Sequence, residues 1–204
     1  MCTVSTLGRG SYHHGDLRAA LLSQARSMLA QSSTLSLRAL AKETGVTPTA
    51  VYRHFADKQA LESALAAQGY GELLQCLKTE HETNVDARED MWRLAWAYII
   101  WARDNEPLFS LMFTTQCDPT APERVEAVKD LTAFLSSQVH HWYPHHATDT
   151  FLTALWGFVH GITTLYLQGK ILTSATTAGA QDVDLEEQVH CLWLAFISPL
   201  PLDH

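Results

Sequence analysis

Residues 36–55 have the sequence SLRALAKETGVTPTAVYRHF, and three positions in it decide the fold of this region. Ala41 is small, which lets two helices cross closely, and Gly45, four residues later, can adopt the left-handed backbone of a turn. Val51, six residues further, supplies a buried apolar side chain to the second helix. A generic pair of helices has no need of all three, so this spacing predicts a helix-turn-helix.

Both helices of this stretch have recognisable starts. Ser36 is expected to cap the first helix. Thr47 followed by Pro48 begins the second, because threonine suits the cap and proline the first turn, and this helix is predicted to reach Phe55. Its non-core positions can face a DNA major groove, and its first-turn N–H groups would point at phosphate.

The rest of the chain shows almost only the helical period, without convincing strand alternation. We therefore predict an all-α protein of about nine helices. A head formed by residues 1–60 is expected to precede a larger body, residues 61–204. The segment 86–105 is apolar around most of its circumference and should run through the middle of the body. The remaining helices are expected over residues 16–31, 57–77, 108–113, 123–142, 148–168 and 184–197.

Composition and charge narrow the class of protein. An apolar fraction of 47% in 204 residues supports a sizeable core. No apolar run has the roughly 18–20 residues of a membrane span, the N-terminus does not resemble a secretory signal, and no CxxC pair occurs, so a cytoplasmic location with no membrane partner is expected. Residues 1–60 carry seven basic and three acidic side chains, a net charge of +4. The remaining residues carry a net charge of −12, and the two parts sum to the −8 of the whole chain. This asymmetry suits a DNA-binding head on an acidic body.

From Tyr12 to Leu65 the chain resembles the DNA-binding domain of the tetracycline-repressor (TetR) family of bacterial regulators. The resemblance rests on SLRALAKETGVTPTAVYRHFADKQAL, residues 36–61, and on the pattern Tyr-x-x-Phe-x-x-Lys that begins at Tyr52. It implies phosphate contacts by some of these side chains and contacts near bases by others. The implied DNA-binding set is Ser36, Arg38, Thr47, Thr49, Ala50, Tyr52, His54 and Lys58. The alternative for Tyr52 and Lys58 is an ordinary surface aromatic and an ordinary solvated charge.

Two later stretches resemble the subgroup of this family named for a Trp-His-Gly motif: AWAYIIWARDNEPLFSLMF at residues 95–113 and LWGFVHGITTL at residues 155–165. The resemblance implies an inducer-responsive homodimer whose last two long helices pack across a two-fold axis. The expected interface comprises Gly157, Gly161, Leu185, Val189, Leu192, Trp193 and Phe196. The side chains expected to line an effector pocket are Trp92, Trp96, Phe109, Met112, Phe113, Trp156 and His160. For these aromatic residues the alternative is plain core.

The sequence therefore predicts a transcriptional regulator, and a repressor is the expected kind. It is expected to bind a palindromic operator in double-stranded DNA as a dimer and to be released by an unknown small molecule. No cofactor is expected. An enzyme is disfavoured because the chain has no Gly-rich phosphate loop, GxSxG elbow or HExxH motif. The alternative is a metal-responsive regulator, because imidazoles bind zinc, copper or nickel and four histidines lie close together: His140, His141, His145 and His146.

Overall fold

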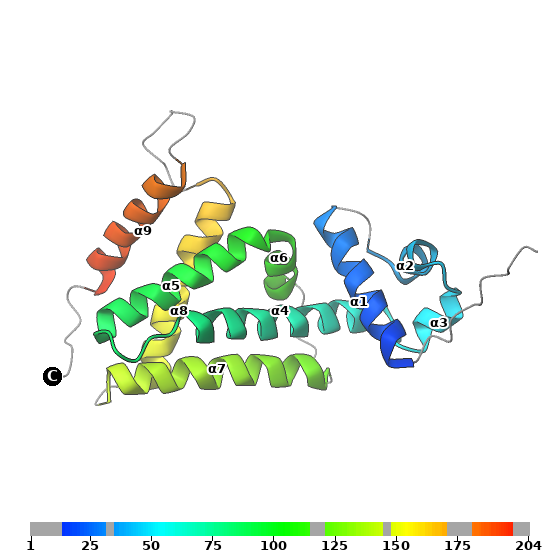
Figure 1. The fold of residues 1–204 in the computed structure, drawn as a ribbon, viewed down its shortest axis with the longest axis horizontal. Helices are drawn as coiled ribbons and strands as arrows, with labels where there is room; N and C mark the ends of the chain where they lie inside the picture. The colour runs from blue at the N-terminus through cyan, green and yellow to red at the C-terminus, as the bar shows by residue number, and fades with distance from the viewer. Residues whose placement is uncertain (1–13, 32–34, 115–120, 145–147, 171–180, 198–204) are drawn as a thin grey trace, which may run out of the picture.

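The structure is a computed structural model that describes residues 14–31, 35–114, 121–144, 148–170 and 181–197. These residues form nine α-helices and no strand, which confirms the predicted fold class (Figure 1). The helices are α1 (His14–Ala30), α2 (Leu37–Thr44), α3 (Pro48–Tyr52), α4 (Lys58–Glu80), α5 (Ala87–Asp104), α6 (Glu106–Thr114), α7 (Pro122–Trp142), α8 (Thr148–Leu167) and α9 (Gln181–Ile197).

The head and the body share one helix. In the head, α1 packs on α2 and on the start of α4, around a core that includes Leu21, Leu40 and Leu65. Helix α4 then continues from Lys58 past the predicted boundary at residue 60 into the body, where it runs beside α7 (Figure 1). The two predicted domains are thus joined by a rigid element instead of a loop.

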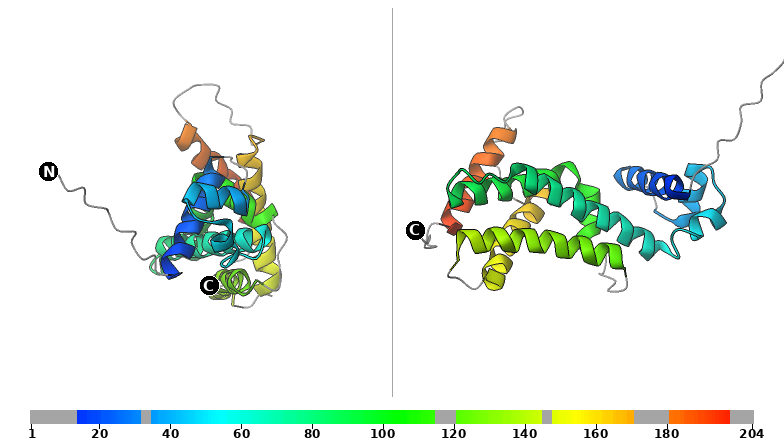
Figure 2. Two further views of the ribbon diagram at one scale, coloured as in Figure 1. Left: turned by 90° about the vertical axis from the view of Figure 1, so that its right-hand side faces the viewer. Right: turned by 60° about the horizontal axis from the view of Figure 1, so that its bottom comes forward.

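Helix α5 occupies the centre of the body, as its composition predicted. It packs against α4, α6, α8 and α9, and Figure 2 shows α8 and α9 at the end of the molecule opposite the head. Asp86 caps α5, because its Oδ1 accepts from the backbone N–H groups of Arg88 (2.8 Å) and Glu89 (3.1 Å). The helix ends at Asp104 with Asn105 as its C-cap, and α6 begins at Glu106 with Pro107 in its first turn, where a missing N–H costs nothing.

Arginines on α1 hold the head against the body. The Arg18 guanidinium donates to both carboxylate oxygens of Glu123 at the start of α7, at 2.6 and 2.8 Å. Two turns later, Arg26 pairs with Glu72 of α4 and donates to the Asn105 side chain at 2.7 Å. The orientation of the head is therefore tied to α4, to α7 and to the α5–α6 turn.

Candidate nucleic-acid interface and internal cavity

The turn of the helix-turn-helix has the geometry that the sequence predicts. The Ser36 hydroxyl accepts from the backbone N–H of Ala39 at 3.1 Å, which caps α2. Gly45 has φ +68° and follows α2, and the next backbone N–H, that of Val46, donates to the Ala41 carbonyl at 3.0 Å. A side chain at residue 45 would be strained in this left-handed conformation, so glycine is needed here.

Helix α3 is shorter than predicted. The Thr47 hydroxyl caps it by accepting from the backbone N–H of Ala50 at 3.3 Å, but the regular helix ends at Tyr52 instead of Phe55. One more turn follows, in which the Phe55 backbone N–H donates to the Val51 carbonyl at 3.0 Å. Both of these apolar side chains are buried, so core packing holds the chain in this turn after the helix has ended.

The predicted DNA-binding residues divide by exposure. Those that are exposed are Arg38, Thr47, Thr49, Tyr52 and Lys58, whereas Ser36, Ala50 and His54 are half-buried. Tyr52 is 48% exposed, a large fraction for an aromatic side chain on a helix. The Lys58 ammonium lies 3.1 Å from Glu62 Oε1, one turn along α4. Its side chain remains more than half exposed.

Two observations in this region depart from the predicted set. His54 lines a cleft of about 380 Å³ between head and body, together with Arg18 and Glu123. Lys42 and Arg53 are exposed and basic, although the predicted set omits them. Their positive charge at non-core helix positions is the sequence feature that could have identified them as candidates for phosphate contacts. The adjoining helices thus expose cationic side chains, threonine hydroxyls and the Tyr52 hydroxyl. These groups can donate hydrogen bonds to phosphate oxygens.

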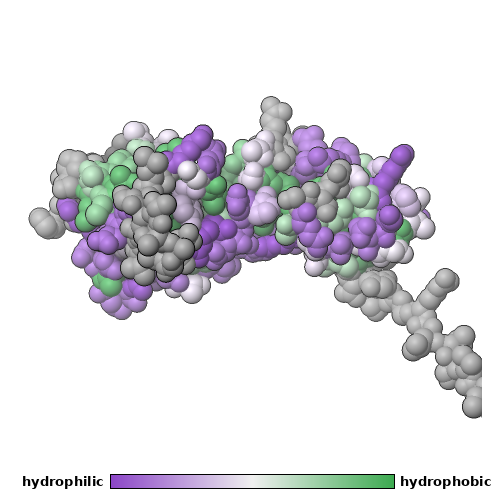
Figure 3. Space-filling model, turned by 90° about the horizontal axis from the view of Figure 1, so that it is seen from above, coloured by the Kyte–Doolittle hydropathy of each residue, from purple (hydrophilic) through white to green (hydrophobic). Residues whose placement is uncertain are grey.

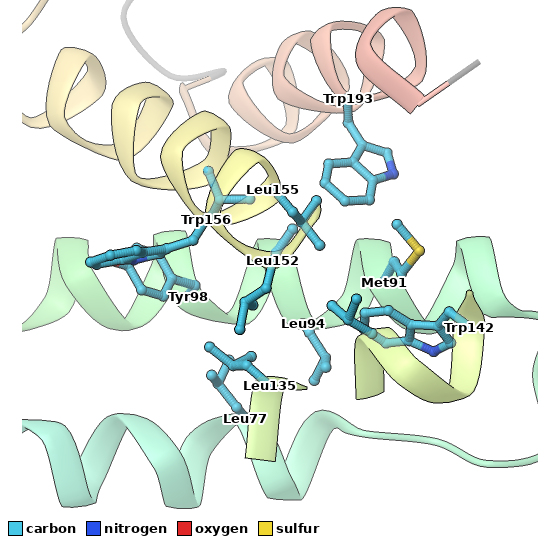
Figure 4. Close-up of a pocket in the computed structure, with 13 residues that line it drawn as sticks. Leu77, Met91, Leu94, Tyr98, Leu135, Trp142, Leu152, Leu155, Trp156 and Trp193 are labelled. Carbon is cyan, nitrogen blue, oxygen red and sulfur yellow. The ribbon is translucent and has the colours of Figure 1, made fainter. Parts of the chain in front are cut away.

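The body contains an apolar cavity of about 50 Å³ between α4, α5, α7, α8 and α9. In Figure 4 Tyr98 and Trp156 lie at one end and Met91 and Trp142 at the other, with leucines between them. A second cavity of about 190 Å³ shares Tyr98, Leu135, Leu152 and Trp156 with the first. The two therefore adjoin, separated by these shared side chains.

Only two members of the predicted pocket line these cavities: Trp156 lines both and Phe113 the second. Phe109 and Met112 are buried core residues, and Trp92 and Trp96 lie on another side of α5. The prediction favoured large aromatics, whereas the first cavity is walled mainly by aliphatic side chains: Leu77, Met91, Leu94, Ala95, Leu135, Val139, Leu152, Leu155 and Val159.

A hydrogen bond between Tyr98 and His160 is the main polar feature beside the cavities. The Tyr98 hydroxyl lies 2.9 Å from His160 Nδ1, and the imidazole sits 4.4 Å from the Phe113 ring centre. Burial raises the pKa of Tyr98 far above its usual range and lowers the pKa of His160. Both groups are therefore neutral at neutral pH, which favours an uncharged ligand.

The predicted dimer stripe of α9 is split between the protomer core and its surface. Leu185, Val189 and Trp193 are 1–2% exposed and belong to the protomer's own core, which corrects the prediction that they face a partner. Leu192 is exposed, and Phe196 is half-buried in a parallel stack with Phe158 of α8, with ring centres 4.0 Å apart. On α8, the predicted Gly157 and Gly161 have open space where a Cβ would stand.

The histidine cluster of the metal alternative is only partly described. His140 and His141 lie exposed in the last turn of α7, whereas His145 and His146 fall outside the described residues. Within the described part of the chain, no three His, Cys, Asp or Glu side chains are grouped to hold a metal ion.

Two family descriptions match this chain. Residues 21–65 match "Bacterial regulatory proteins, tetR family", and residues 91–194, half of the chain, match "Tetracyclin repressor-like, C-terminal domain". The first match contains the helix-turn-helix, and the second contains both cavities' walls from α5, α7 and α8. Neither description names the Trp-His-Gly subgroup, which stays a prediction.

Similar proteins have the same fold. A protein of unknown function from Rhodococcus sp. RHA1 is 31% identical, with a TM-score of 0.72 over 92% of this chain and 98% of that one. The FadR transcriptional regulator of Bacillus subtilis, solved in complex with stearoyl-CoA, is 12% identical, with a TM-score of 0.67 over 90% and 99% of the chains. An uncharacterised HTH-type transcriptional regulator of Haemophilus influenzae is 23% identical over 76% of this chain and 70% of its own length.

Proposed function

This chain belongs to the TetR family of bacterial transcriptional regulators, and on that basis we propose that it is a repressor released from DNA by a small molecule. In this proposal it binds a palindromic operator as a homodimer in the cytoplasm. The observation that carries the proposal is the span of α4. Leu61 and Leu65 of this helix are buried in the head, and Leu77 lines the cavity in the body.

A small tilt of α4 is enough to change how two heads meet DNA. At 1.5 Å per residue, the 19 steps from Lys58 to Leu77 span about 28 Å, so a tilt of about 10° moves the start of α4 by about 5 Å. Half-sites in successive major grooves lie about 34 Å apart. A ligand that binds better to the tilted state would shift the dimer toward a head spacing that no longer matches them.

The dimer is supported by apolar surface on α8 and α9. Trp156, Leu165, Leu192 and Leu194 are 45–46% exposed. Figure 3 shows hydrophobic surface gathered over the end of the molecule where these helices lie. By length and composition, helix α8 is apolar enough over Asp149–Leu167 to cross a membrane. Only 22% of that window is buried in the protomer, so most of its apolar surface is left uncovered. In a TetR-family protein this uncovered surface fits a partner protomer better than lipid.

Sedimentation or light scattering tests the dimer. The double variant Leu165→Lys with Leu192→Lys is expected to be monomeric and to lose operator binding, because two charges would be desolvated in the interface. The matched control is Val125→Lys, which replaces an exposed apolar residue of α7. A double variant that remains dimeric would refute the proposed interface.

The effector is proposed to be an uncharged, largely apolar molecule. The cavity walls carry no charged side chain, and their polar groups are neutral, among them the hydroxyls of Tyr70, Tyr98, Thr132 and Thr153 and the indole N–H of Trp193. Both cavities are smaller than the roughly 300 Å³ of an ordinary ligand pocket, so binding must spread the helices. This requirement gives a ligand the means to move α4.

Filling the cavity separates effector response from DNA binding. Leu152 lines both cavities, and Leu152→Trp is expected to abolish release by any effector found in a screen of apolar compounds while operator binding persists. Leu167→Trp is the control, because this half-buried leucine of the same helix lines neither cavity. Normal release of the Leu152→Trp variant would place the effector elsewhere.

A further inference from the structure

A groove of about 530 Å³ lies on another side of α5 from the internal cavity. Its apolar lining comes mainly from α5, namely Trp92, Trp96, Ala97, Ile100 and Trp101. Helix α4 contributes Cys76 and Glu80, and α9 contributes Glu186. This volume falls within the range of about 300–1,000 Å³ in which proteins bind small molecules.

The groove offers a large aromatic surface in a fixed arrangement. Trp92 and Trp96 stack with ring centres 5.7 Å apart and planes 20° apart. The Trp92 ring is held from α9 by His190, whose ring centre lies 4.5 Å away. Trp92 and Trp101 are largely buried, whereas Trp96 is half-buried and exposes part of its indole. Indole is the aromatic group that binds cations best.

The charge around this aromatic floor is strongly negative. Four carboxylates line the groove, those of Glu80, Glu89, Asp104 and Glu186, against the single guanidinium of Arg93. Asp104 is neutralised by Arg103 at 2.9 Å. The three glutamates have no ion-pair partner within the described part of the chain.

We propose that this groove is a second binding site and that it takes a lipophilic organic cation, with aryl or alkyl groups against the tryptophans and the positive charge among the three glutamates. Neither part alone selects this ligand class. An apolar floor without charge would accept neutral molecules, and carboxylates without the floor would hold only solvated counterions. The uncharged walls of the internal cavity favour the opposite class of ligand, so the two sites are chemically distinct.

Calorimetric titration of the full chain with tetraphenylphosphonium tests the site, with tetraphenylborate as a probe of the same shape and opposite charge. We expect saturable binding of the phosphonium, weakened by added salt, and no measurable binding of the borate. Equal binding of both ions would overturn the proposal, because the groove would then recognise apolar surface alone. Absence of phosphonium binding would overturn it as well.

Variants locate the binding to this groove. Neutralising Glu80, Glu89 and Glu186 together to glutamine should weaken phosphonium binding about tenfold, because three weak attractions between the cation and partly exposed carboxylates are lost together. The control neutralises three exposed glutamates outside the groove, Glu43, Glu106 and Glu187, and makes the same change in net charge. Equal weakening in both triple variants would refute the site, because only the total charge would then matter.

The tryptophan floor and the internal cavity provide a second comparison. Trp96→Leu should also weaken phosphonium binding several-fold, by loss of the cation–π contact. Leu152→Trp, which fills the internal cavity, should leave it unchanged. The reverse result, binding lost in Leu152→Trp and retained in Trp96→Leu, would assign the cation to the internal cavity and overturn the proposal. These titrations need no DNA and are independent of the proposed repressor function.

Discussion

Asp90→Ala is expected to be among the most destabilising single changes in the body. The Asp90 carboxylate is 2% exposed and lies in the first turn of α5. It accepts from the backbone N–H of Glu82 at 2.9 Å and from the Trp142 indole N–H at 3.2 Å, and it lies 3.0 Å from His81 Nδ1. One carboxylate thus connects the end of α4, the start of α5 and the end of α7.

The size of the effect follows from these three contacts. A hydrogen bond to a charged group contributes about 1.5–3 kcal/mol, and a buried donor left without an acceptor costs about 1–3 kcal/mol. Because an alanine side chain would make none of the three contacts and water could reach part of the site, we expect a loss of about 4 kcal/mol. Asp90→Asn keeps one acceptor oxygen and should lose about half as much. Trp142 also walls the cavity, so both variants should weaken effector response.

Urea denaturation at one fixed protomer concentration measures this loss, because dimerisation contributes to the apparent stability. Asp86→Ala is the matched control: this aspartate caps the same helix from an exposed position, and its loss should cost about 1 kcal/mol. If Asp90→Ala costs no more than Asp86→Ala, the three contacts do not hold the helices together and the reasoning fails.

Three further predictions concern DNA, packing and pH. Lys58→Ala should weaken binding almost equally on all DNA sequences and reduce the salt slope by about one; a loss confined to the operator would argue against a phosphate contact. Gly69→Ala should lower the free energy of unfolding by about 1–2 kcal/mol, because its Cβ would clash with Met112 Sδ. Gly71→Ala, with open space at its Cβ, should instead raise it by up to about 1 kcal/mol. Equal effects of the two substitutions in urea denaturation would contradict this. Because burial lowers the pKa of His160 in the folded state, its contribution to stability is present above about pH 6.5 and is lost as the pH falls through the folded value. His160→Phe should therefore flatten the fall in melting temperature below about pH 6.5, and an unchanged pH profile would exclude this histidine as its source.

Local rules explain why the helix-turn-helix could be predicted from the sequence. Caps at Ser36 and Thr47, the left-handed turn at Gly45 and the buried Val51 all depend on residues within a few positions of one another. Most helix boundaries follow in the same way from caps, glycine and proline. The early end of α3 is the exception, since the chain beyond Tyr52 is held by packing of Phe55 in the core.

The cavity and the surface of α9 depend on neighbours distant in sequence. An apolar stripe such as Leu185, Val189 and Trp193 must be covered, but its spacing cannot show whether the protomer or a partner covers it. The cavity wall joins aliphatic residues of several helices, so aromatic residues were a poor guide to it. Asp90 similarly looks like an exposed charge near a helix start, and its burial depends on Trp142, 52 residues away.

The proposed function requires that the exposed face around α3 recognise a particular DNA sequence. Fluorescence anisotropy with labelled duplex from the promoter region beside its own gene, compared with a scrambled duplex at two salt concentrations, measures this recognition. We predict binding to the promoter at least about 10³-fold tighter than to the scrambled duplex, weakened by salt and with two protomers per site or a multiple of two. Equal, salt-sensitive binding to both duplexes would contradict sequence recognition by this face and leave only electrostatic attraction.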